Sequence, residues 1–407
     1  MILMVNPSCH LNPRHQQGAV SLLIGLVLLS AITVIALLTA KTVAVEIQAS
    51  ANQVRTAQAV AAAQYAMDFG VSYFDGGGFD HDRDGVVDVL PVPDLVSAFD
   101  GRVTQGKVVF DPADGTRCVS AGGKADLKRG VLEATGFSDD GLASRTVSQC
   151  LTALPVLNAQ LPPFALVTRG GVTLTGNSIL INRYAPNTAH AGGKVMLATS
   201  QLKTYINALN PAQAAMTTPD KINPDSAIST QAASSAGLGL GLDIWEQDLE
   251  LATLTEEAFF GRFFSLPKAV VKQLAVSNNA FFDAPDGLDL SGGSGGLIWL
   301  EGTQSLSKGT LGSPDKPAIL VVNGDLSVGG SVNFYGLLYV SGALHVTDGD
   351  PSLTGTAAVE NSAAGSGTVA VSGAGSLSLV YWPDFGGDNS PVLPGTAAVV
   401  AGSWRDW

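Results

Sequence analysis

A run of alternating aspartates has the residue types and spacing of a cation-binding loop. Residues 80–88 read Asp-His-Asp-Arg-Asp-Gly-Val-Val-Asp. Ca²⁺ takes roughly six to eight oxygen ligands, and alternate side chains on a tight loop can converge on one point. The expected ligands are the carboxylates of Asp80, Asp82 and Asp84, the carbonyl oxygen of Val86, and a direct or water-bridged contact from Asp88. The pattern predicts a Ca²⁺ site, and a solvated acidic loop is the alternative.

This loop differs from an EF-hand. Gly85 permits the sharp turn, but Pro91 stands where an EF-hand carries a bidentate Glu. An EF-hand is therefore excluded, and Asp75 or Asp94 is available to complete the ligand shell.

Residues that could carry catalysis are few and scattered. Residues 292–296 read Gly-Gly-Ser-Gly-Gly, which matches the G-x-S-x-G pattern of serine hydrolases. That pattern requires a strand-turn-helix setting, whereas this run precedes an expected strand. His81, His190 and His345 are far apart in the sequence. We expect a protein that is not an enzyme; a membrane-anchored envelope protein that binds or cleaves glycans is the alternative.

The element that precedes these residues is a long helix. Residues 19–40 contain no charged side chain, and as a helix they span about 33 Å, enough to cross the hydrocarbon core of a bilayer. Their few hydroxyls can bond back to the preceding helical turn. A buried core helix is the alternative, but such helices seldom stay apolar on all faces over this length.

The helix is expected to continue well beyond the apolar run. Residues 41–69 contain no Pro or Gly and are rich in Ala, which gives a helix of about 75 Å in all. Gly70 is the expected stop. An apolar stripe at helical spacing is formed by Ile47, Val54, Ala57, Ala61 and Tyr65.

Gly18-Ala19-Val20 opens the apolar run at the start of the helix, and no small-x-small cleavage box follows it. With the uncharged run and its Ala-rich continuation, this start resembles a type IV prepilin. The resemblance implies cleavage between Gly18 and Ala19 by the prepilin peptidase and insertion in the inner membrane as a single span. It also implies packing of the helix against other pilins or pseudopilins, with the head in the periplasm or in an extracellular pilus.

One departure narrows the resemblance. Most prepilins carry Glu at the fifth mature position, where this chain has Leu23. The Glu is missing in PilX-type pilus assembly proteins and in the large tip pseudopilins of type II secretion, so the resemblance implies a minor component. Phrases similar to PilX-type proteins recur at residues 259–264, 312–317, 321–326, 334–339 and 402–406.

Cleavage after Gly18 would also determine which cysteines remain to form a disulfide. It would remove Cys9 and leave Cys118 and Cys150, 32 positions apart, in an oxidising compartment. We expect a disulfide between them; two free thiols or a metal pair are the alternatives. No C-x-x-C spacing supports a zinc site.

From residue 162 onward the sequence has the texture of short strands separated by glycines. Strands are expected at residues 164–168, 172–174, 179–181 and 318–322. Glycines then follow at intervals of six residues, at positions 324, 330, 336 and 342. This series predicts a β-solenoid or a tightly turned meander. The expected fold class is therefore α+β, with a long N-terminal helix and a mainly β, solenoid-like head.

A helical insertion interrupts the head between about residues 201 and 280. Residues 248–275 are predicted to be helical, with a break at Pro267 and a cap at Thr253. Most of Phe259, Phe260, Phe263 and Phe264 fall on one helical face. We expect them to be buried, with the helix covering one end of the β-domain; a subunit-contact patch is the alternative.

Composition sets the limits on partners. The 407 residues carry a net charge of −13, which argues against a nucleic-acid partner because phosphate contacts need clustered Lys and Arg. Only 14% of the residues are charged and 46% are hydrophobic, which excludes a disordered chain. The expected divisions are a leader (1–18), a transmembrane and amphipathic helix (19–70), a calcium-loop and disulfide subdomain (71–155) and a Gly-rich β head (156–407).

Overall fold

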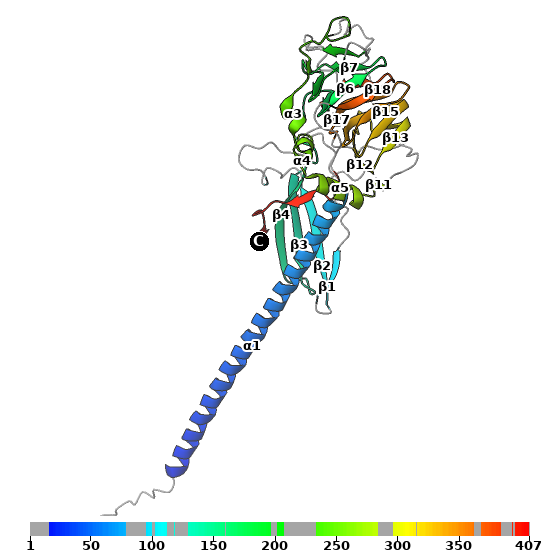
Figure 1. The fold of residues 1–407 in the computed structure, drawn as a ribbon. Coiled ribbons are helices and arrows are strands. Elements are labelled where there is room, and N and C mark those ends of the chain that lie inside the picture. Colours follow the sequence, from blue (N-terminus) through cyan, green and yellow to red (C-terminus); the bar gives the residue numbers. More distant parts are fainter. Residues whose placement is uncertain are drawn as a thin grey trace, which may run out of the picture.

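The chain begins with helix α1, Gln16–Tyr73, which is 58 residues long and ends in one π-helical turn, η2, Phe74–Gly78. The computed structural model describes residues 16–78, 95–99, 102–111, 118, 129–158, 160–196, 202–206, 233–283, 296–314, 316–361, 368–383, 393 and 395–406, with the side chains of α1 from Val20 onward. α1 extends as a rod from a β-rich body (Figure 1). The predicted fold class, a long N-terminal helix followed by a mainly β head, is confirmed.

Gly70 does not end α1 as we predicted. Gly70 is buried, and a Cβ atom there would lie 2.8 Å from Cδ2 of Leu132 and 3.0 Å from Cγ2 of Val108. The missing side chain therefore lets the helix approach the adjacent sheet, and the helix continues to Tyr73.

The second half of α1 lies across an antiparallel sheet of six strands. The strand order is β1-β2-β3-β4-β20, and β21 also pairs with β4. The strands are β1 (Leu95–Phe99), β2 (Arg102–Asp111), β3 (Arg129–Phe137), β4 (Ser144–Ala153), β20 (Ala397–Val399) and β21 (Arg405–Asp406). Because β20 and β21 come from the end of the chain, everything between β4 and β20 is inserted into this sheet. The predicted subdomain of residues 71–155 did not include the later strands β20 and β21, which complete this sheet.

The inserted segment forms a curled sheet of 15 strands whose pairs are parallel. Its strands are β5 (Leu166–Thr168), β6 (Gly171–Leu174), β7 (Ile179–Asn182), β8 (Ala189–Ala191), β9 (Lys203–Ile206), β10 (Ile244–Trp245), β11 (Phe281–Asp283), β12 (Gly296–Glu301), β13 (Gln304–Leu311), β14 (Ala318–Asn323), β15 (Leu326–Val340), β16 (Leu344–Val346), β17 (Ser352–Val359), β18 (Val369–Gly373) and β19 (Ser378–Tyr381).

The repeat length of this sheet differs from the six-residue glycine series. Leu326 pairs with Leu344, 18 residues later, and Gly336 pairs with Gly355, 19 residues later. Gly330 and Gly336 both lie inside the single long strand β15, with φ of 57° and 132°. These glycines therefore bend one strand rather than separating short strands, because positive φ is costly for other residues.

The strands are not stacked in sequence order. The longest series of hydrogen-bonded neighbours in this sheet runs in the order β10-β8-β5-β17-β15-β14-β12-β11. The chain thus enters in the middle at β5, proceeds to one end at β10, crosses to the opposite end at β11, and returns until β17 pairs with β5. A seam between β17 and β5 joins the two halves.

Three helices make the crossing between the two ends. They are α3 (Leu249–Thr253), α4 (Glu256–Phe260) and α5 (Lys268–Ser277). Asp248 caps α3, Thr255 caps α4, and Pro267 precedes α5. The predicted cap at Thr253 is therefore wrong, because the Thr253 hydroxyl donates to the carbonyl oxygen of Leu249 within α3.

The four phenylalanines of this segment are buried, as expected. Each is at most 2% exposed, and all four rings surround Tyr339 of β15. They pack against the outer sides of β12, β14, β15 and β17, whereas the opposite sides of these strands fill the interior of the curled sheet. The helices thus cover one flank of the sheet rather than its end.

Candidate functional site

The apolar half of α1 is the first part of the candidate site. Among the described residues, α1 is the one helix long and apolar enough to cross a membrane, and its most apolar stretch is entirely exposed in this chain. The hydroxyls of Ser30, Thr33 and Thr39 bond back to carbonyl oxygens three or four residues earlier, at 2.6–2.9 Å. These bonds were expected, and they leave the helix surface apolar.

The residues of the predicted cleavage site lie in the first turn of α1. Gly18 and Ala19 are helical in the backbone, and their side chains are outside the described set. Leu23 is 64% exposed on the helix surface. Cleavage between Gly18 and Ala19 stays a prediction.

The buried face of the second half of α1 is not the apolar stripe noted in the sequence. Ile47, Val54 and Tyr65 of the predicted stripe are 46–63% exposed. The buried face instead consists mainly of small residues at helical spacing, namely Gln58, Ala59, Ala62, Ala63, Ala66, Met67 and Gly70. This face packs on Val108, Leu132 and Val147 of the antiparallel sheet.

Small side chains are required there because the helix and the sheet approach closely. A Cβ at Gly106 of β2 would lie 2.9 Å from the carbonyl oxygen of Ala62. At Gly136 of β3 it would overlap the backbone of Ala59 and Ala63. At these two glycines the helix presents alanines to the sheet, whereas Ile47, Val54 and Tyr65 are exposed on other sides of α1.

A polar contact fixes the helix to the turn between β3 and β4. Arg55 Nε donates to Asp140 Oδ2 at 2.6 Å, and the amide nitrogen of Asp139 donates to Gln58 Oε1 at 3.3 Å. The backbone N–H of Leu142, the Ser138 hydroxyl and Arg55 together lower the pKa of Asp140 to about 2. Asp140 therefore stays ionised, and Arg55 stays paired, well into the acid range.

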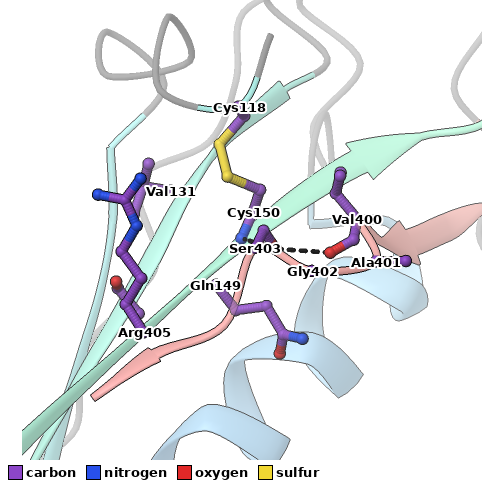
Figure 2. Close-up of a pocket in the computed structure, with 10 residues that line it drawn as sticks. Cys118, Val131, Gln149, Cys150, Val400, Ala401, Gly402, Ser403 and Arg405 are labelled. Atoms are coloured by element: carbon purple, nitrogen blue, oxygen red, sulfur yellow. Dashed lines mark hydrogen bonds between the residues drawn. A yellow bond between two sulfur atoms is a disulfide. The ribbon is translucent and has the colours of Figure 1, made fainter. Parts of the chain in front are cut away.

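The structure contains the predicted disulfide between Cys118 and Cys150, with a Cα–Cα distance of 5.5 Å. Cys150 lies in β4, where its amide nitrogen donates to Ser403 Oγ at 3.0 Å and its carbonyl oxygen accepts from the Val400 amide at 2.9 Å. Figure 2 shows the end of the chain passing beside the disulfide. A cavity of about 230 Å³ lies between them, lined also by Gln149 and Arg405.

The predicted calcium ligands lie outside the described residues. This applies to Asp80, Asp82, Asp84, Val86 and Asp88 alike. Within the described part of the chain, no group of three or more His, Cys, Asp or Glu side chains is placed to hold a metal ion. The calcium site stays a prediction.

Sequence reasoning missed a buried polar cluster beside the seam. Glu360 follows β17 and is fully buried; its Oε2 accepts from Tyr339 Oη at 2.5 Å and lies 3.4 Å from Lys268 Nζ of α5. Burial raises the pKa of Glu360. The only signal in the sequence is one acidic residue in an otherwise uncharged segment. The cluster fastens the crossing helices to the sheet, because a buried carboxylate needs partners.

Two histidines outside the predicted loop also have partners. His190 Nε2 lies 2.6 Å from Asp248 Oδ2, and His345 Nδ1 lies 2.9 Å from Ser372 Oγ. Asp248 is the cap of α3, so the first pair joins that helix to β8. Each pair links neighbouring elements.

Comparison with known proteins finds little likeness. No family model and no curated protein matches the chain. Among solved structures, the chain is similar to the competence-associated pilin ComZ from Thermus thermophilus, with 13% identity over 87% of this chain and 97% of that chain. The TM-score is 0.25, too low to assign a family or a function.

Proposed function

We propose that this chain is a non-catalytic, pilin-like component of a type IV pilus or a related secretion pseudopilus. The observation that carries the proposal is the division of α1. Its apolar half makes no contact that buries it within the chain, and its second half is seated on an antiparallel sheet. An exposed apolar surface of this size is unfavourable in water, so a bilayer or the helices of other subunits must cover it.

The outward side of the seated half supports packing between subunits. Ile47, Val54 and Tyr65 are exposed although they are apolar or aromatic and lie on one stripe. In an assembly of pilins or pseudopilins, these side chains would contact helices of neighbouring copies. These side chains would then be exposed in the single chain because they become buried only when subunits assemble.

Several finer features belong to the same proposal. The prepilin peptidase would cut between Gly18 and Ala19, the head would lie in the periplasm, and Ca²⁺ bound by residues 80–88 would stiffen the junction between helix and head. Leu23 in place of Glu favours a minor, PilX-type or tip component over a major subunit. The parallel pairing of the inserted sheet supports a β-solenoid head.

Mass spectrometry of the mature N-terminus tests the proposal. The chain is produced in cells with an active prepilin peptidase, together with a Gly18→Val variant as the matched control. We expect the wild-type protein to begin at Ala19, with an N-methylated amine by analogy with prepilins, and the variant to begin at Met1. A wild-type protein that also begins at Met1 would overturn the proposal and favour the membrane-anchored glycan protein.

A further inference from the structure

A short turn beside β10 presents three leucines to solvent. Residues 237–242 read Gly-Leu-Gly-Leu-Gly-Leu. Leu238 is 68% exposed, Leu240 43% and Leu242 95%, and Trp245 of β10 is 50% exposed. We call residues 235–242 the leucine turn.

Hydrogen bonds hold the leucine turn in shape. The amide nitrogen of Gly239 donates to the carbonyl oxygen of Ser235 at 2.8 Å, and that of Leu238 donates to the same oxygen at 3.2 Å. The amide nitrogen of Gly241 donates to Ser234 Oγ at 2.8 Å. These three N–H groups are thus satisfied within residues 234–241 and would stay paired in an apolar phase.

The base of the turn is anchored to the sheet by a buried carboxylate. Asp243 is 2% exposed, and its two oxygens accept from Ser234 Oγ and Thr188 Oγ1, each at 2.6 Å. The leucines therefore project from a fixed base instead of folding back onto the sheet.

The leucine turn lies at the end of the inserted sheet that is remote from α1. β10 and β11 are the two ends of the strand order, and Figure 1 shows β11 and α5 beside the antiparallel sheet and α1. A membrane that holds the apolar half of α1 is therefore on the opposite side of the molecule from the leucine turn.

Size and charge favour lipid over a protein partner. The leucine turn has eight residues, whereas a standard protein interface takes roughly 20–30 residues a side. None of residues 235–242 is charged. The charged residues on adjoining elements are Lys203 and the acidic Asp243, Glu246, Asp248 and Glu250, so acid predominates around the turn. Such a surface has no net attraction for anionic headgroups.

We propose that the leucine turn inserts into a second bilayer of zwitterionic lipid, opposite the one that α1 enters. Leu238 and Leu242 reach furthest into solvent and would be buried first among the acyl chains, with Trp245 near the headgroups. The proposal goes beyond pilus assembly and requires only that α1 be held in a membrane.

Vesicle capture tests it with the full chain. The protein is reconstituted through α1 into dense, sucrose-loaded liposomes with the head outside. These are mixed with light, fluorescent, protein-free vesicles of phosphatidylcholine, and the fluorescence that sediments is measured. We expect capture by the wild type, and an apparent affinity lower by about tenfold for each of Leu238→Ser and Leu242→Ser.

A matched control separates this surface from general stickiness. Leu142 is 73% exposed in the turn between β3 and β4, so Leu142→Ser removes an equally exposed leucine elsewhere and should leave capture unchanged. Absence of capture by the wild type, capture that Leu238→Ser and Leu242→Ser do not reduce, or capture that needs anionic lipid would each overturn the proposal. Clustering restricted to protein-bearing vesicles would also overturn it and indicate contact between copies. None of these results depends on where the mature chain begins.

Discussion

Gly136 provides a direct test of how α1 is seated on the antiparallel sheet. A Cβ atom at this position would overlap the carbonyl oxygen of Ala59 and the amide nitrogen of Ala63. Both obstacles are helix backbone, which cannot rotate aside as a side chain can. Gly136→Ala must therefore push α1 away from β3 and weaken the packing of Leu132, which is fully buried beneath it.

The expected loss of stability depends on which atoms the new Cβ would overlap. Overpacking a dense core costs about 1–3 kcal/mol, and a clash with backbone belongs at the upper end. About 3 kcal/mol corresponds to roughly a hundredfold more frequent local opening. At Gly70 a new Cβ meets only side-chain methyls of Leu132 and Val108, and the gain of about 1 kcal/mol in helix propensity offsets their displacement. Gly70→Ala should therefore be nearly neutral.

Hydrogen exchange followed by mass spectrometry measures this opening in the detergent-solubilised full chain. A local readout is needed because a chain with two separate sheets need not unfold in one step. Gly136→Ala should speed exchange of β3 amides and of residues 58–70 by about a hundredfold. Gly76→Ala is the matched control, since no atom lies within 4 Å of its would-be Cβ. Unchanged exchange in Gly136→Ala, or equal acceleration in Gly76→Ala, would refute the claim that α1 packs on β3 through a close contact at Gly136.

Four further predictions follow from single side chains. Asp140→Asn should remove a stabilisation that is present above pH 3.8 and lost as the pH falls through the lowered pKa of about 2; a difference from wild type that does not shrink at all as the pH falls from 3.8 to 2 would contradict it. Glu360→Gln should show the opposite trend, because the raised pKa of the buried Glu360 makes the wild type lose stability as pH rises above 4.5; a pH-independent difference in denaturant unfolding would count against it. Cys118→Ser should lower the free energy of unfolding by about 3–4 kcal/mol through the opened loop, and an unchanged denaturation midpoint would argue that the disulfide adds nothing. Asp84→Ala should abolish calorimetric Ca²⁺ binding, and retained binding would remove the predicted loop from consideration.

The elements that the sequence predicts well are those fixed by local pattern. The uncharged run and the Ala-rich continuation determine α1, because helix propensity and length act within the segment. The strands near residues 166–182 and 318–323 were foreseen from their apolar runs. The disulfide was also foreseen, since cleavage would leave only two cysteines.

Pairing between distant segments was not predictable in the same way. Nothing in the short strands β20 and β21 indicates that they return to β4, roughly 250 residues earlier in the chain. The pairing of β17 with β5 at the seam was equally unpredictable, because both are ordinary apolar parallel strands that would fit many neighbours. The glycine series has two kinds of member: Gly324 and Gly342 lie between strands, whereas Gly330 and Gly336 bend β15, and a bend has the same sequence signature as a turn.

The choice of the buried face of α1 has a more instructive cause. Hydrophobicity alone would place Ile47, Val54 and Tyr65 inward, but at Gly106 and Gly136 the sheet comes so close to α1 that alanines lie against it. Volume therefore overrides hydrophobicity in choosing the buried face. The larger apolar side chains of the stripe are left exposed, as are the three leucines beside β10 at the far end of the molecule. Both surfaces lie on segments held by the fold, and our two proposals cover the first with helices of other pilins and the second with a second bilayer.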